Sequence, residues 1–112
     1  MDDLSTTVGE LKAEVARFAD ERDWLRFHTP KNLAMSVAIE AAELMEEFQW
    51  IDSAASTALL DDAGKKTAVE EELSDVLIYL LQLANVAGIE IGPAVRRKMA
   101  LNAKKYPRIE DR

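Results

Sequence analysis

Two pairs of acidic residues at helical spacing are the part of this sequence best suited to chemistry. Glu40 and Glu43 lie three residues apart in the otherwise apolar run LAMSVAIEAAELM, and Glu72 and Asp75 repeat that spacing in EEELSDVLIY. Residues three apart on a helix share one side, with Cβ atoms roughly 5–6 Å apart. Carboxylates among apolar side chains need a counter-ion. Two facing pairs would form an oxygen-only cage, which suits Mg²⁺, with Mn²⁺ able to substitute.

Two other interpretations of these acids have to be considered. In a chain with 21 acidic residues, an E-x-x-E pair is usually a solvated helix face, and this is the expected role of Glu46, Glu47, Glu70 and Glu71. The four cage acids differ because both pairs lie in or beside strongly apolar helices. A di-iron carboxylate site would need Glu-x-x-His on two helices. The only histidine, His28, belongs to neither pair, which excludes that site.

Hydrophobic periodicity predicts four helices and no strands. The first covers residues 4–23, where Thr7 and Glu10 fit a capping box. The second begins at Thr29-Pro30, a cap followed by an N1 proline, and runs to about residue 50. The third covers about 65–87 and stops at Gly88, and the fourth runs from about 92 to before Pro107. The segment between helices two and three is expected to be a loop with at most one short helical piece.

The second and third helices are apolar nearly all round, which predicts an all-α bundle with a partner subunit. A surface helix normally keeps one polar face, and a single domain spanning residues 1–112 cannot easily cover both sides of two such helices. We therefore expect a four-helix bundle assembled as a homo-oligomer, either a dimer or a tetramer. The alternative is that the first and fourth helices cover the other two within one chain.

Charge and composition narrow the class of protein further. The chain has 14 basic and 21 acidic residues and a net charge of −7, so non-specific nucleic-acid binding is not expected. The absence of cysteine excludes disulfides and thiol catalysis. The start, MDDLSTT, does not resemble a secretory signal. The most apolar run, VLIYLLQLANVAG, is much shorter than the ~20 residues that span a bilayer. These features predict a soluble, cytoplasmic protein with no membrane partner.

Longer motifs around the four acids resemble the all-α nucleotide pyrophosphohydrolases of the MazG-like superfamily. The matching stretches are RDWLRFHTPKNLA, EEFQW, EELSDVLIYLLQLA and KMALNAKKYP, so the resemblance runs from about Phe18 to Pro107. Together they are most similar to the dCTP pyrophosphatase branch. The commoner superfamily pattern is E-E-x-x-E, and Ile39 replaces its first glutamate here. The branch tolerates an apolar residue at that position.

The resemblance implies hydrolysis of a nucleoside triphosphate between its α and β phosphates. The products would be a monophosphate, dCMP if the substrate is dCTP, and pyrophosphate. Glu40, Glu43, Glu72 and Asp75 would hold Mg²⁺, which neutralises phosphate oxygens and positions a water for attack. Either a carboxylate of the cage or Glu47 would accept the proton of that water. The same reaction on dUTP or on several nucleotides is the close alternative, and a non-catalytic helical oligomer is the alternative of another class.

The remaining site residues are also implied mainly by the resemblance. Lys98, Asn102 and Tyr106 lie in the only basic cluster of the chain and would bind phosphate, although cations also favour a helix C-terminus. Lys31 and Asn32 would either bind phosphate or order their loop. Aromatic rings flank the second helix and suit a stacked base, although such residues are often core anchors. The expected base and sugar residues are Trp24, His28, Trp50 and Tyr79.

Overall fold

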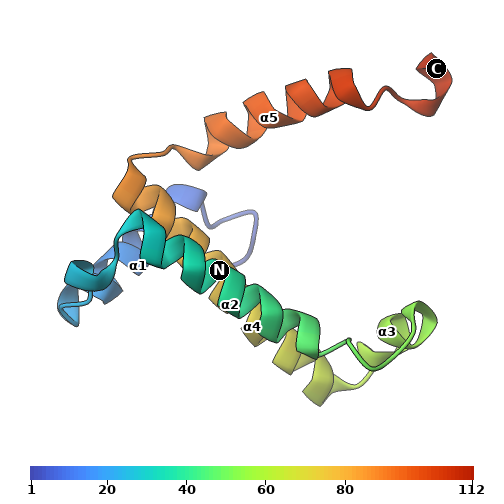
Figure 1. Cartoon of the computed structure of the whole chain (residues 1–112), viewed down its shortest axis with the longest axis horizontal. Coiled ribbons are helices and arrows are strands. Elements are labelled where there is room, and N and C mark those ends of the chain that lie inside the picture. The colour runs from blue at the N-terminus through green and yellow to red at the C-terminus, as the bar shows by residue number, and fades with distance from the viewer.

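The computed structural model describes all 112 residues, and the chain is entirely helical (Figure 1). Its α-helices and 3₁₀ turns follow in chain order as α1 (Val8–Glu21), η1 (Leu25–Phe27), α2 (Pro30–Glu46), α3 (Ser53–Leu59), α4 (Ala63–Ala87), α5 (Ile91–Lys105) and η2 (Ile109–Asp111). The predicted all-α class is confirmed. There are five α-helices rather than four, because the predicted loop after α2 contains α3.

Side-chain caps explain where the helices begin. The Thr7 hydroxyl accepts a hydrogen bond from the third backbone N–H of its helix at 3.1 Å, and Thr29 does the same for α2 at 3.2 Å. Asp52 and Asp62 cap α3 and α4 in the same way, at 2.8 and 3.0 Å. These bonds satisfy N–H groups that have no partner within the helix. The two threonine caps were predicted from the sequence, whereas the two aspartate caps were not.

Two predicted boundaries were wrong by about one turn. The first helix begins at Val8 rather than residue 4, because the Asp2 carboxylate accepts from the backbone N–H groups of Leu4 and Ser5 and forms a separate turn. The helix α2 ends at Glu46 rather than near residue 50. After it, the backbone N–H of Phe48 bonds to a carbonyl three residues back, at 3.0 Å, which tightens the chain into a turn before α3.

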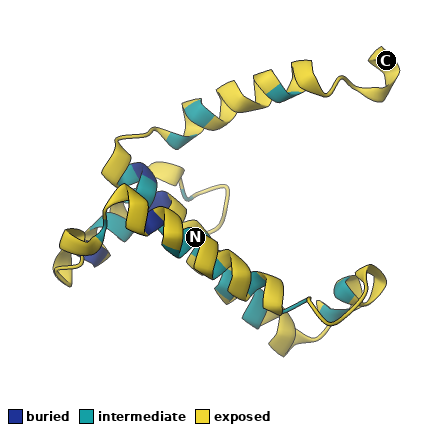
Figure 2. Cartoon of the chain, viewed as in Figure 1, coloured by how far each residue is buried: buried dark blue, intermediate teal, exposed yellow.

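The core lies where α2 and α1 pack on α4. Its buried apolar residues are Ala19, Leu33, Leu81 and Ala84. Figure 2 shows these buried positions gathered at one end of the α2–α4 pair, with exposed residues over most of the remaining surface. The pairing of α2 with α4 therefore positions whatever lies along their shared seam.

The last long helix leaves this core and does not pack against it (Figure 1). Gly88 ends α4 with φ at 67°, a left-handed conformation that glycine adopts without a Cβ clash. The Lys12 ammonium group donates a hydrogen bond to the carbonyl of Ile89 at 2.7 Å, which ties this connection to α1. No single helix is long and apolar enough to cross a membrane, although α4 and α5 taken together as a pair bent by 103° satisfy the length and composition criterion.

The single chain is extended for its size. Its radius of gyration is 17.0 Å, whereas a compact domain of this length has about 13 Å. It exposes 8765 Å², whereas a compact monomer of this mass exposes about 6,200 Å². Much of the excess is apolar: Met35 and Ile39 of α2 and Leu73 of α4 are each more than half exposed. Within one chain, α1 and α5 leave these two apolar helices largely uncovered.

Candidate functional site

Three of the four predicted acids converge on the seam between α2 and α4. Carboxylate oxygens of Glu40, Glu43 and Glu72 all lie within 4.8 Å of one another. The i, i+3 spacing brings the first two together on α2, and helix packing brings Glu72 to them from α4. Asp75 lies outside this trio but close enough for its charge to act on both Glu40 and Glu72. Glu47 likewise acts on Glu72.

Glu40, Glu43 and Glu72 together with the neighbouring Asp75 form the carboxylate cluster, whose electrostatics are unfavourable without a counter-ion. Loss of contact with water raises the pKa of the Glu40 carboxyl above 4.5, and its interaction with Glu43 raises it further. The pKa of Glu72 is raised in the same direction, again first by loss of water and then by the charge of Glu43. Both effects disfavour the ionised form.

The cluster fits a hard divalent cation. One carboxylate oxygen of Glu40 and one of Glu72 are buried and accept no hydrogen bond. Buried acceptors without a protein partner are uncommon, and they suit a bound ion or water. The donors are all oxygens, which favours Mg²⁺ or Mn²⁺ over softer metals. The residues present therefore fit the predicted magnesium site.

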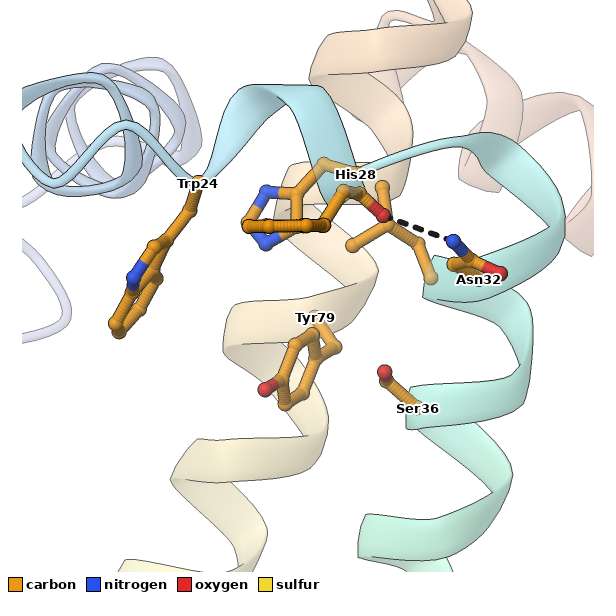
Figure 3. Close-up of a pocket in the computed structure, with 7 residues that line it drawn as sticks. Trp24, His28, Asn32, Ser36 and Tyr79 are labelled. Atoms are coloured by element: carbon orange, nitrogen blue, oxygen red, sulfur yellow. Dashed lines mark hydrogen bonds between the residues drawn. The ribbon is translucent and has the colours of Figure 1, made fainter.

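A cavity of about 410 Å³ lies between η1, α2 and α4 (Figure 3). Three of the four residues predicted to contact the base and sugar line it: Trp24, His28 and Tyr79. A second cavity of about 440 Å³ shares these three residues and is also lined by Asp75. The second cavity therefore adjoins the carboxylate cluster through Asp75 of α4.

Local backbone geometry places the Trp24 ring in these cavities. Asp23 adopts the left-handed conformation, with φ at 56°, which aspartate tolerates better than most residues. The N–H of Trp24 then bonds back to the carbonyl of Ala19 at 3.0 Å and ends α1. The indole packs edge-on between Phe18 and His28, with ring centroids at 5.6 and 6.4 Å. The ring is thus held by α1 while 44% of the residue stays exposed.

Sequence reasoning did not assign Ser36 or Gln82 to the site, whereas Asn32 was predicted to bind phosphate or order its loop. Asn32 and Ser36 of α2 also line the first cavity, and Asn32 donates to the carbonyl of Phe27 at 3.0 Å (Figure 3). Gln82 lines the second cavity and is 2% exposed. The one available signal was that Gln82 is polar within an otherwise apolar stretch of α4.

Other predicted residues are not brought to this site within the single chain. Lys98, Asn102 and Tyr106 lie on or at the end of α5, which projects away from the α2–α4 pair (Figure 1). Trp50 follows α2, is 87% exposed and lines neither cavity. Lys31 is exposed in the first turn of α2 and also lines neither cavity. The roles assigned to these residues stay predictions.

A model of the MazG-like family matches residues 35–112. The chain belongs to the MazG-like family. The matched segment contains the whole carboxylate cluster and α5 but begins after Trp24 and His28. The resemblance drawn from the sequence motifs is thereby confirmed.

Individual relatives extend the similarity over nearly the whole chain. The dCTP pyrophosphatase 1 of Rattus norvegicus is 41% identical over 101 residues, which cover 90% of this chain and 59% of the rat protein. The Homo sapiens dCTP pyrophosphatase 1 is 40% identical with the same coverage. The chain thus spans about three fifths of the length of these relatives. A crystal structure of a pyrophosphatase from Archaeoglobus fulgidus is similar with a TM-score of 0.85 and 47% identity, covering 96% of this chain and 99% of that one.

The raised pKa values predict how stability without a metal depends on pH. A carboxyl with a raised folded-state pKa binds its proton more tightly in the folded protein than in the unfolded chain. Ionisation of this carboxyl therefore costs no folding stability below its unfolded-state pKa, and the loss of stability grows as pH rises through its folded-state pKa. In EDTA, the melting temperature of Glu72→Gln minus that of wild type should therefore increase as pH rises above 4.5. Saturating Mg²⁺ should raise the wild-type melting temperature more than that of the variant.

The exposed neighbour Glu71 provides the control for this measurement. Glu71→Gln removes the same charge from the same helix turn but not from the cluster. The plot of its melting temperature against pH should therefore stay parallel to that of wild type. Parallel curves for Glu72→Gln as well would contradict the electrostatic account of the cluster.

Proposed function

We propose that this protein is a Mg²⁺-dependent nucleoside triphosphate diphosphatase, which hydrolyses its substrate to a nucleoside monophosphate and pyrophosphate. The observation that carries the proposal is the position of the carboxylate cluster beside an aromatic cavity. The cluster suits a metal-bound triphosphate, and the cavity suits a flat ring. Family membership supports the same activity, since similar proteins are named dCTP pyrophosphatase or pyrophosphatase.

A pyrimidine deoxynucleotide, dCTP or a modified dCTP, is the proposed substrate. Support comes from the rat and human relatives, which are named for dCTP and match 90% of this chain. The Trp24 indole can stack on a base, an interaction worth about 1–3 kcal/mol, while Tyr79 lies one helical turn beyond Asp75, toward the sugar. Hydrolysis of dUTP or of several nucleotides is the alternative within the same reaction class. It would show as similar kcat/KM values for the different bases.

The proposed mechanism assigns the metal to Glu40, Glu43, Glu72 and Asp75. When bound there, Mg²⁺ supplies positive charge for the phosphate oxygens and makes a coordinated water more acidic. A carboxylate of the cluster or Glu47 accepts a proton from the attacking water. The packed α2–α4 seam keeps these groups in fixed positions, which is the main requirement for in-line phosphoryl chemistry.

The phosphate end of the site is proposed to come from another protomer. Lys98, Asn102 and Tyr106 are the assigned phosphate ligands, but in one chain α5 lies away from the carboxylates. A homo-oligomer, either a dimer or a tetramer, would cover the exposed apolar faces of α2 and α4. Each chain exposes about 2,600 Å² more than a compact monomer, so burial of this excess in two protomers would remove about 5,200 Å² in total, at the upper end of the range for obligate homodimer interfaces. The α5 of one protomer could then reach the acids of its neighbour, with Lys31 near the same phosphates.

Removing one cluster charge should abolish this activity without unfolding the protein. Glu43→Gln keeps the shape of the side chain, removes one metal ligand and relieves repulsion, so turnover should fall by more than about a hundredfold while the EDTA melting temperature stays equal or rises. Turnover is measured as pyrophosphate release from dCTP with Mg²⁺, and the melting temperature is measured by thermal unfolding in EDTA.

The matched control is Glu70→Gln, since Glu70 is exposed on α4 outside the cluster. Its activity should equal that of wild type, and wild-type activity should vanish with EDTA. Retention of most activity by Glu43→Gln, or orthophosphate as the first product, would exclude the proposed reaction.

Co-expression of two inactive variants tests whether the site is shared between protomers. Glu43→Gln damages the carboxylates and Lys98→Ala damages α5, so a mixed assembly contains one site with both parts intact. With random pairing, about one site in four should regain activity, because half the dimers are mixed and each has one intact site.

The control pairing joins Glu43→Gln with Asp75→Asn, two lesions that both lie in the cluster of their own chain. This pair should stay inactive. A wild-type protein that sediments as a monomer at micromolar concentration, or a Glu43→Gln and Lys98→Ala mixture with no recovered activity, would show that α5 does not act across an interface.

A further inference from the structure

A partly buried series of hydrogen-bonded side-chain amides leads from α1 through α4 to His28. The Asn85 amide nitrogen donates to the backbone carbonyl of Lys12 at 2.9 Å and to the side-chain oxygen of Gln82 at 3.0 Å. The Gln82 amide nitrogen then lies 3.2 Å from Nδ1 of His28. Gln82 is 2% exposed, so water cannot readily replace these partners. This series therefore connects the core to a residue that lines both aromatic cavities.

The direction of every hydrogen bond in this series follows from its first member. A backbone carbonyl only accepts, so the group that Asn85 turns toward Lys12 must be its NH₂. The second hydrogen of that NH₂ points to Gln82, which must present its oxygen. The opposite end of the Gln82 amide, its NH₂, is then left facing His28. Nδ1 of His28 accepts this hydrogen bond, and the ring proton of the neutral imidazole must be on Nε2.

The opposite arrangement would leave buried donors unpaired. A proton on Nδ1 would face the Gln82 NH₂, donor against donor. Turning the imidazole over would put a carbon against that NH₂ instead. Turning the Gln82 amide over would bring its NH₂ against that of Asn85. Because buried polar groups without partners are strongly disfavoured, the packed structure selects one tautomer.

The proton on Nε2 is available to a ligand. Nε2 of His28 makes no hydrogen bond to another residue of the protein, and it is not a buried atom. The ring stands beside Trp24 and Tyr79 around the cavity (Figure 3). A ligand that stacks on the indole would therefore meet a hydrogen-bond donor at its edge.

We propose that Gln82 and Asn85 are positioning residues that hold His28 as the Nε2–H tautomer, so that the cavity selects a ring whose edge presents an acceptor. This inference rests on the proposed function for the identity of the ligand. A pyrimidine fits the requirement because its ring carbonyl oxygen is an acceptor in both cytosine and uracil. The donor is compatible with both pyrimidines and does not by itself separate dCTP from dUTP.

The tautomer can be measured without any ligand. His28 is the only histidine, so a long-range ¹H–¹⁵N correlation spectrum contains one set of ring signals. At about pH 8, where an ordinary imidazole is neutral, the wild-type spectrum should show the proton on Nε2. Gln82→Leu removes both amide bonds at similar volume and should give a mixture. Gln82→Glu offers only acceptors and should move the proton to Nδ1. Asn85→Ala releases the Gln82 amide and should also give a mixture.

Kinetics then test what the tautomer does. In Gln82→Glu the Nε2 atom becomes an acceptor and faces the ring carbonyl, so KM for dCTP should rise roughly 3- to 10-fold, the equivalent of one lost hydrogen bond, with little change in kcat. Inorganic tripolyphosphate, which has no base, provides the control for the added negative charge. Its inhibition constant should rise less than KM for dCTP. Gln82→Leu should show an intermediate KM and an unchanged tripolyphosphate constant.

Each failure has a separate meaning. A wild-type proton on Nδ1, or a wild-type tautomer retained in Gln82→Glu, would overturn the hydrogen-bonded series. Equal effects of Gln82→Glu on dCTP and tripolyphosphate, in a variant whose tautomer has moved, would overturn the role in base selection. A wild-type protein that neither binds nor hydrolyses any nucleoside triphosphate would overturn the proposed function and its ligand, while the tautomer is decided independently by the spectrum.

Discussion

Repulsion among carboxylates on the α2–α4 seam is the constraint on which the rest of this structure depends. Glu40, Glu43 and Glu72 place oxygens within 4.8 Å of one another, and one carboxylate oxygen each of Glu40 and Glu72 is buried without a partner. Such a group opposes folding unless something offsets it. Apolar packing of α2 on α4 offsets it in part, and a bound cation would offset the remainder. The packing of α2 on α4 must therefore be stable for the site to form, and repulsion among the carboxylates of the site in turn destabilises that packing.

The same seam explains why the chain is incomplete as a single unit. The apolar residues that hold α2 to α4 extend around both helices, and α1 covers only one side. The other sides stay exposed, and α5 carries its basic residues away from them. In the proposed assembly, one interface serves two purposes, because it buries the apolar faces and brings cations to the acidic cluster. Assembly and catalysis would then depend on the same contacts.

Some of this could be predicted from the sequence because it depends on short-range patterns. The convergence of Glu40 with Glu43 follows from helical spacing, and Thr7 and Thr29 mark helix starts by their side-chain chemistry. Glu72 could be assigned to the same site because it and Asp75 repeat, on the third predicted helix, the three-residue spacing of Glu40 and Glu43. The positions of Trp24, His28 and Tyr79 around shared cavities followed from the family resemblance rather than from periodicity.

Other features depend on contacts that no local pattern encodes. Gln82 and Asn85 were visible only as polar residues in an apolar helix, and their partner Lys12 lies 73 residues from Asn85. The direction of α5 depends on Gly88, whose role as a helix stop was predicted but whose exit angle was not. Trp50 was predicted at the end of α2, but a tightened turn after Glu46 separates it from that helix.

The central claim is that the carboxylate cluster is a divalent-metal site, and a crystal containing Mn²⁺ tests it most directly. An anomalous difference map would locate the metal independently of any assumption about catalysis. A peak is expected about 2.0–2.3 Å from oxygens of Glu40, Glu43 and Glu72, and none in the same place for Glu43→Gln. A cluster without a peak in crystals soaked with Mn²⁺, or peaks confined to exposed acids such as Glu46 and Glu70, would contradict it.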